Sequence, residues 1–124
     1  MYNSTGERMH YVLLCYGGAW QNGAQSDAEC GALEEARRTS DDALRVSGYL
    51  LALEEFEPCR TAMTVRVQDG TTDVRIGHAT GAAEHVREVF IITARDLNEA
   101  IQVAASMPQA RVGAIEIRPL VLVS

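Results

Sequence analysis

The stretch Arg87–Pro119, REVFIITARDLNEAIQVAASMPQARVGAIEIRP, decides the fold of this 124-residue chain because it predicts a strand, a helix and a second strand in succession. Val89–Ile92 is a β-branched and aromatic run of strand length. Asp96 is placed to cap a helix, and Glu99 three residues later completes a capping box. After the helix, Ala114–Arg118 alternates between apolar and polar residues, as a half-buried strand does.

The predicted helix needs a sheet beneath its apolar side. Pro108 ends this helix, and its apolar residues recur at helical spacing: Leu97, Ala100, Ile101, Ala104 and Met107. Two strands cannot cover such a stripe, so the rest of the chain must supply more of them.

Upstream residues supply these strands and a further helix. His10–Tyr16 is a nearly continuous apolar run, typical of a central strand. A helix is predicted from Ser26 or Asp27 to about Ser47, and Asp69-Gly70 marks a tight turn between strands. The remaining strands are predicted at 49–55, 61–68 and 72–76.

The order is therefore β-α-β-β-α-β with an extra short hairpin arm, which is the ferredoxin-like arrangement of the α+β class. Residues 1–9 are predicted to be a flexible N-terminal leader, and residues 10–124 to form a single domain.

The helix predicted before Ser47 has a weak apolar stripe. Thr39–Asp42 interrupts it, so a break in the helix is one alternative. The apolar side is predicted to include Ala36 or Arg37, Leu44 and Val46. The charged residues are expected on a solvated face with local ion pairs: Glu34, Glu35, Arg37, Arg38, Asp41 and Asp42.

Strand parity predicts which side chains face the helices. Those expected toward the helices are Met63, Val65, Val67, Ile115 and Ile117, and those expected on the bare face are Thr64, Arg66, Gln68, Glu116 and Arg118, with Phe90 and Ile92 as apolar neighbours. A bare face of this kind predicts a homodimer with a cleft between facing sheets. Two interpretations of the polar set remain open, a cross-strand ion network or a ligand site.

Composition argues against several classes of function. The net charge is −6 with no basic run, so no nucleic-acid partner is expected. No apolar run approaches the roughly 20 residues of a membrane span, and residues 1–9 lack a signal-peptide core, which predicts a cytoplasmic protein. Cys15, Cys30 and Cys59 lack metal-ligand spacing, as do the three histidines, so neither a metal nor another cofactor is expected.

The candidate catalytic residue is His78, which follows Gly77 in a loop between predicted strands. An imidazole in such a loop can act as a general acid or base near neutral pH, and a plain surface histidine is the alternative. Tyr16, at the exit of the first strand, can donate a hydrogen bond to a ligand or pack in the core. Trp20, in the following loop, can line a binding site or cover the core.

The ordered set of segments between Tyr11 and Pro119 resembles the YCII-related family, in the branch marked by a DGPF motif. The matching segments are YVLLCYGG, RVSGYLL, LEEFEP, TAMTVRVQDG, VFIIT, DLNEAIQVAASMP and GAIEIRP. The resemblance implies a dimeric α+β-barrel-type fold with one cleft per subunit. Some similar proteins look like small-molecule lyases or hydrolases with a His/Asp pair at the cleft. Others are associated with sigma-factor-like proteins.

This chain departs from the motif of that branch. Where the family would show T-D-G-P-F, it has Arg75-Ile76-Gly77-His78-Ala79. Ile76 stands at the acidic position, so the family's carboxylate cannot be carried over. Either this chain lacks the family chemistry, or it uses different chemistry built on His78.

Two functions are therefore predicted as alternatives. The first is a small cytosolic enzyme that acts on an organic small molecule by lyase, cyclase, isomerase or hydrolase chemistry, with specialised metabolism as its setting. His78 would transfer the proton, and Arg66 and Arg118 would bind an oxyanion or carboxylate beside Glu116, Tyr16 and Trp20. The second is a non-catalytic dimeric module that binds a ligand or serves as a regulatory accessory of a sigma-factor-associated type.

Overall fold

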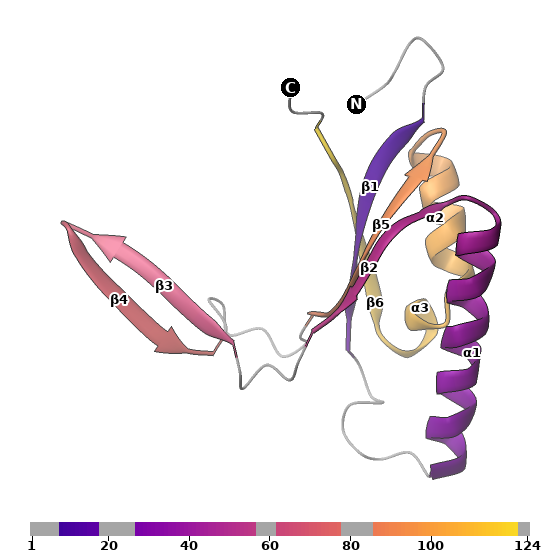
Figure 1. Ribbon diagram of the computed structural model, residues 1–124, viewed down its shortest axis with the longest axis horizontal. Helices are drawn as coiled ribbons and strands as arrows, with labels where there is room; N and C mark the ends of the chain where they lie inside the picture. The colour runs from indigo at the N-terminus through magenta and orange to yellow at the C-terminus, as the bar shows by residue number, and fades with distance from the viewer. Residues whose placement is uncertain (1–7, 18–26, 57–61, 78–85, 122–124) are drawn as a thin grey trace.

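The computed structural model describes residues 8–17, 27–56, 62–77 and 86–121 (Figure 1). The predicted site residues His78 and Trp20 lie outside these ranges. The elements follow in the order β1 (Met9–Tyr16), α1 (Asp27–Val46), β2 (Leu50–Glu55), β3 (Met63–Gln68), β4 (Thr71–Ile76), β5 (Val86–Ala94), α2 (Leu97–Ser106), α3 (Gln109–Val112) and β6 (Ala114–Pro119).

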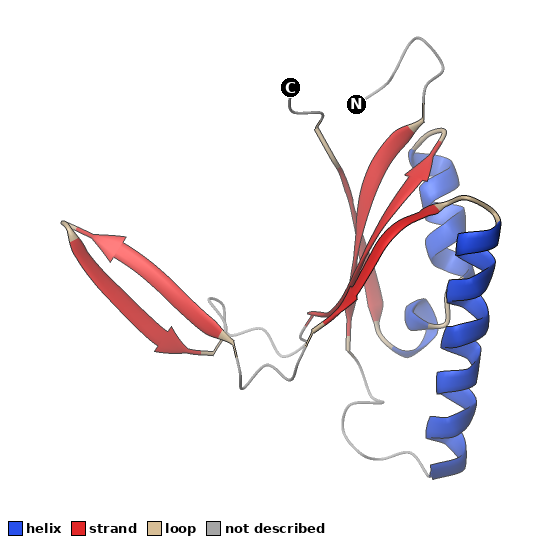
Figure 2. Ribbon diagram, viewed as in Figure 1, coloured by secondary structure: helices blue, strands red, loops and turns tan. Residues whose placement is uncertain are grey.

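Four of the strands form one antiparallel sheet in the order β2-β5-β1-β6. The two central strands, β1 and β5, are paired along their length, so that Leu13 lies opposite Phe90. The helices cover one face of this sheet (Figure 2). This is the strand order of the split βαβ arrangement, so the predicted ferredoxin-like α+β fold is confirmed.

The core lies between the sheet and the helices. Its fully enclosed side chains come mainly from the two central strands and α2: Tyr11, Leu13, Cys15, Phe90, Ile92, Ala100, Val103, Ala104 and Met107. Ile115 and Ile117 pack against it, as predicted.

Phe90 and Ile92 were predicted on the bare face, and that prediction is wrong because both are completely buried on the helix side. Their strand neighbours Val89 and Ile91 are half-buried and point the other way. Because this strand has apolar residues on both of its faces, its sequence allows either face to lie toward the helices. Only the packing of the helices on the sheet decides which face is buried.

The α2 prediction is correct in its cap and wrong in part of its stripe. Asp96 Oδ1 accepts a hydrogen bond of 2.9 Å from the Glu99 backbone N–H, and Glu99 Oε1 accepts one of 2.8 Å from the backbone N–H of Arg95. Leu97 and Ile101, however, are about half exposed. The helix packs its small residues onto the sheet, which allows close approach and turns the larger side chains outward.

The other helix, α1, runs without a break from Asp27 to Val46, so the alternative of an interruption at Thr39–Asp42 is wrong. Gly48 adopts a φ of 84°, which suits the residue that follows a helix end. Val46 is exposed rather than part of the apolar side, whereas Leu44 is buried. Among the described residues, no helix is both long enough and apolar enough to cross a membrane.

Among the strands that the structure describes, β3 and β4 pair only with each other, in a two-stranded sheet. The turn between them has positive φ at both Asp69 and Gly70, as expected for an Asp-Gly hairpin. The prediction that Met63, Val65 and Val67 face the helices is wrong, because all three are exposed. Alternation shows that one side of the hairpin is apolar, but it does not show which sheet the strand joins.

Candidate functional site

The helix-free face of the four-stranded sheet carries the candidate site. In β1 the residues that alternate with the core are half-buried Val12, Leu14 and Tyr16, and in β5 they are Val89 and Ile91. This face, called the open face below, is therefore apolar at its centre. Its polar groups include Glu116 and Arg118 of the edge strand β6 and the hydroxyl of Tyr16 in β1.

Tyr16, Glu116 and Arg118 come together on the open face. The Tyr16 hydroxyl donates a hydrogen bond of 2.8 Å to Glu116 Oε1, and Arg118 Nη1 lies 3.9 Å from Glu116 Oε2. The pairing of β1 with β6 brings them together, because it sets Tyr16 opposite Ala114 and Leu14 opposite Glu116. Glu116 and Arg118 form an ion pair within β6 and not across strands. The predicted ion network, which included Arg66, and the alternative ligand-binding role both stay predictions.

The electrostatics of this trio favour a fully protonated phenol beside a carboxylate. The hydrogen bond to Glu116 raises the pKa of Tyr16 above 10.0, and burial and the negative charge of Glu116 add to this. Tyr16 is consequently a hydrogen-bond donor at neutral pH. The three groups offer a donor, an acceptor and a cation within one cluster, the set that orients a small polar ligand.

Arg66 does not join this cluster by the route that sequence parity suggested. Its strand, β3, lies in the two-stranded sheet, where Arg66 is opposite Asp73. The argument that Arg66 and Arg118 share a sheet face is therefore wrong. A ligand-binding role for Arg66 stays a prediction that the described residues do not support.

The segments that contain His78 and Trp20 are attached to the sheet at the Tyr16 end. Residues 78–85 lead directly into Val86, whose Cα partner in the sheet is Tyr16. Residues 18–26 begin immediately after Gly17. Residues 78–85 also begin directly after Gly77, so His78 adjoins the end of β4, and the positions of His78 and Trp20 stay predictions.

A buried polar cluster on the other side of the sheet was missed by sequence reasoning. Arg37 of α1 and Glu88 of β5 are only 6% and 2% exposed. Arg37 Nη2 lies 2.7 Å from Glu88 Oε2, and Gln109 Nε2 donates a 3.1 Å hydrogen bond to Glu88 Oε1. Arg37 also pairs with Glu34 and, at 3.4 Å, with Glu55.

The prediction that Arg37 lies on a solvated face is therefore wrong. Burial alone lowers the pKa of Arg37, but the hydrogen bond and negative charge of Glu88 outweigh it, so the net shift is upward. A signal did exist in the sequence: Glu88 shares the strand parity of Phe90 and Ile92. A charged residue that points to the same side of a strand as the core residues needs a buried partner of opposite charge.

Two further titratable groups border this cluster. Burial, followed by the negative charge of Glu88, raises the pKa of Asp41 to about 6. Burial also raises the pKa of the Cys15 thiol to about 12, which makes this cysteine a core residue and a poor nucleophile. Arg37, Glu88 and Gln109 are buried, and their contacts connect α1, β5 and α3.

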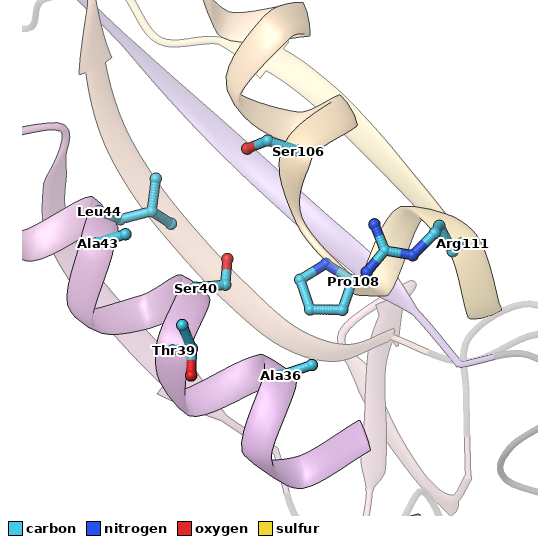
Figure 3. Close-up of a pocket in the computed structure, with 8 residues that line it drawn as sticks. All are labelled: Ala36, Thr39, Ser40, Ala43, Leu44, Ser106, Pro108 and Arg111. Atoms are coloured by element: carbon cyan, nitrogen blue, oxygen red, sulfur yellow. The ribbon is translucent and has the colours of Figure 1, made fainter. Parts of the chain in front are cut away.

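A groove of about 430 Å³ separates α1 from the α2–α3 segment (Figure 3). One wall consists of residues of α1, most of them small, and the other includes Ser106 and Pro108. The Arg111 side chain extends into the space beside Pro108 (Figure 3). The lining residues are Ala36, Thr39, Ser40, Ala43, Leu44, Ser106, Pro108 and Arg111.

Within the described ranges, no three His, Cys, Asp or Glu residues gather closely enough to hold a metal ion.

Residues 9–124 match the family model of the YCII-related domain, so the chain belongs to the YCII-related family. The search of curated proteins gave no match.

Proposed function

We propose that this chain is a small cytoplasmic enzyme that acts on an organic small molecule by general acid–base chemistry at the open face. The observation that carries the proposal is the convergence of the Tyr16 hydroxyl, the Glu116 carboxylate and the Arg118 guanidinium beside an apolar surface. A ligand with an apolar body and one anionic group matches that surface.

Each group has a distinct role in this proposal. Arg118 binds the substrate's carboxylate or developing oxyanion, because a guanidinium forms strong charge-assisted hydrogen bonds. In the free protein, the single hydroxyl proton of Tyr16 is donated to Glu116, which also pairs with Arg118. When substrate binds, Tyr16 donates this proton to a substrate oxygen instead.

His78 is the proposed proton-transfer residue, and Trp20 the proposed apolar contact. By the resemblance to the DGPF branch, Ile76 stands at the acidic position, so in this proposal a carboxylate that assists His78 comes from elsewhere in the chain. Glu116 is the proposed carboxylate: it accepts a hydrogen bond from Tyr16, which is the Cα partner of Val86 at the start of β5. Lyase, cyclase, isomerase and hydrolase reactions all use such a proton transfer.

Hydrogen–deuterium exchange tests the proposal without knowledge of the overall reaction. The protein is incubated in D₂O with a panel of small keto acids, hydroxy acids and cyclic carboxylates, and loss of C–H signals is followed by NMR. Exchange of at least one panel member is expected. His78→Ala should slow it by roughly 100-fold, the lower end of the range for a general acid or base.

Variants of the open face refine this test. Glu116→Gln and Tyr16→Phe should also slow exchange, while Glu35→Gln, at an exposed position on α1, should leave it unchanged. A wild-type exchange rate in His78→Ala would refute the proposed proton transfer. A protein that exchanges no panel member would refute the enzyme proposal for these substrate classes.

A non-catalytic ligand-binding module is the second candidate, and the groove beside α1 favours it. Its volume lies within the range of small-molecule sites. Arg111 has no ion pair within the described part of the chain, so it can bind an anion. A ligand bound there could serve the regulatory accessory role.

The same panel separates the two candidates. Binding without proton exchange, together with chemical-shift changes in α1 and α3 that disappear in Arg111→Ala, would favour the binding module. Proton exchange that is unaffected by Arg111→Ala would favour the enzyme proposal, with its site at the open face.

A further inference from the structure

The hairpin β3–β4, called the arm below, has one strongly apolar side. The register sets Met63 opposite Ile76 and Val65 opposite Val74, which places these four residues on one side. The same side includes Val67. Their exposed fractions are 58% for Met63, 60% for Val65, 65% for Val67, 53% for Val74 and 75% for Ile76.

The other side of the arm is polar. Arg66 lies opposite Asp73 and Thr64 opposite Arg75. Thr64 also donates a 2.6 Å hydrogen bond to the carbonyl of Gly77. The arm is thus a well-formed amphipathic hairpin with a favourable turn, and its two sides are sharply different in chemistry.

Within the described part of the subunit, more than half of each apolar side chain of the arm is exposed. It stands away from the four-stranded sheet (Figure 1). An isolated two-stranded hairpin is marginally stable in water and needs packing on one face. Five aliphatic side chains on one exposed surface mark an interaction site.

The chain also presents an apolar surface that can receive such an arm. The centre of the open face consists of Val12, Leu14, Val89 and Ile91, and the helices cover only the opposite side of this sheet (Figure 2). The apolar side of the arm and the centre of the open face are both aliphatic surfaces, so they can pack against each other. Both belong to the same chain, and they are apart in the subunit.

We propose that the apolar side of the arm packs on the open face of a second copy of this chain. In a two-fold symmetric pair, both apolar surfaces of each subunit are covered, because each subunit packs its arm on its partner and receives the partner's arm on its open face. The exchange closes on itself, so it forms a dimer rather than a filament.

The consequence for function is that the open face is incomplete in a single subunit. The partner's arm would form a wall over the apolar centre beside Tyr16 and Glu116, and would exclude water from them. This inference deepens the homodimer expected for the proposed function, but it does not depend on the chemistry proposed for His78.

Two matched double variants test the arm. Val65→Glu/Val74→Arg places an opposite-charge pair across the strands, which supports the hairpin while removing the apolar side. Gln68→Glu/Thr71→Arg makes the same charge change at a facing pair on the polar side. The mass of each protein is measured by light scattering over a range of concentrations, and NMR of the β3 and β4 amides confirms that the hairpin persists.

The wild type and Gln68→Glu/Thr71→Arg should be dimers, and Val65→Glu/Val74→Arg should dissociate with a Kd raised by roughly 100-fold or more, as for central apolar interface residues. A dimeric Val65→Glu/Val74→Arg variant with an unchanged Kd would overturn the arm inference and leave the dimer and the chemistry intact. A monomeric wild type would overturn both the arm inference and the dimer.

A crosslink locates the contact independently of variant stability. A photoreactive benzoylphenylalanine replaces Val67 in unlabelled protein, which is mixed with ¹⁵N-labelled wild type. Crosslinks from the arm to labelled peptides of β1 or β5 would support the inference. Crosslinks confined to peptides of the same chain would overturn it.

Discussion

Replacing Arg37 by leucine should destabilise the protein far more than a surface mutation does. Arg37 Nη2 lies 2.7 Å from Glu88 Oε2, and Glu88 is only 2% exposed. Without Arg37, the Glu88 carboxylate keeps Gln109 as its hydrogen-bond donor but loses its neutralising cation. Breaking a buried pair in this way costs roughly 3–5 kcal/mol in the free energy of unfolding.

Urea denaturation at neutral pH measures this cost. With a slope of about 2 kcal/mol per M, the midpoint of Arg37→Leu should fall by about 2 M relative to the wild type. The matched control is Arg38→Leu, the next residue on α1, whose side chain is 68% exposed and pairs with exposed Glu35 at 3.4 Å. This control should change the free energy of unfolding by less than about 1 kcal/mol.

The double variant Arg37→Leu/Glu88→Leu separates loss of charge pairing from loss of packing. Removing both charges leaves no isolated buried ion, so most of the stability lost in Arg37→Leu should return. If Arg37→Leu costs no more than Arg38→Leu, the pair is not buried in solution and the reasoning fails. If the double variant is as unstable as Arg37→Leu, charge burial is not the cause.

Two further predictions concern groups near this cluster. The pKa of Asp41 is about 6 in the folded protein and ordinarily 3.8. As pH rises, Asp41 therefore loses its proton at a lower pH in the unfolded chain than in the folded protein. Stability should therefore fall as pH rises from about 4 to about 6, and Asp41→Asn should reduce that fall in urea titrations; an identical pH profile would contradict this. Cys15, whose pKa burial raises to about 12, should resist iodoacetamide in the native protein and react after unfolding, as judged by peptide mass mapping. Native labelling of Cys15 as fast as in urea would contradict its burial.

Local patterns in the sequence were sufficient for the elements and for the fold. The Asp96 cap, the Asp69-Gly70 turn and the alternation around Ile115 and Ile117 depend on interactions within a few residues or on one strand's pleat. Their order then restricts the topology, because a split βαβ unit brings β1 to the centre between β5 and β6. The same alternation in β6 correctly placed Glu116 and Arg118 on the face of the sheet away from the helices.

Tertiary structure alone decided where each apolar surface goes. Phe90 and Ile91 are equally hydrophobic neighbours, and only packing against α2 shows that Phe90 faces the helices. Val65 and Val67 form a regular apolar stripe, but the stripe does not reveal that β3 leaves the main sheet. Arg37 looks like any surface arginine until Glu88 meets it from a strand 51 positions away along the chain. Periodicity reports which residues share a side of their own element, whereas burial depends on contacts between elements distant in sequence.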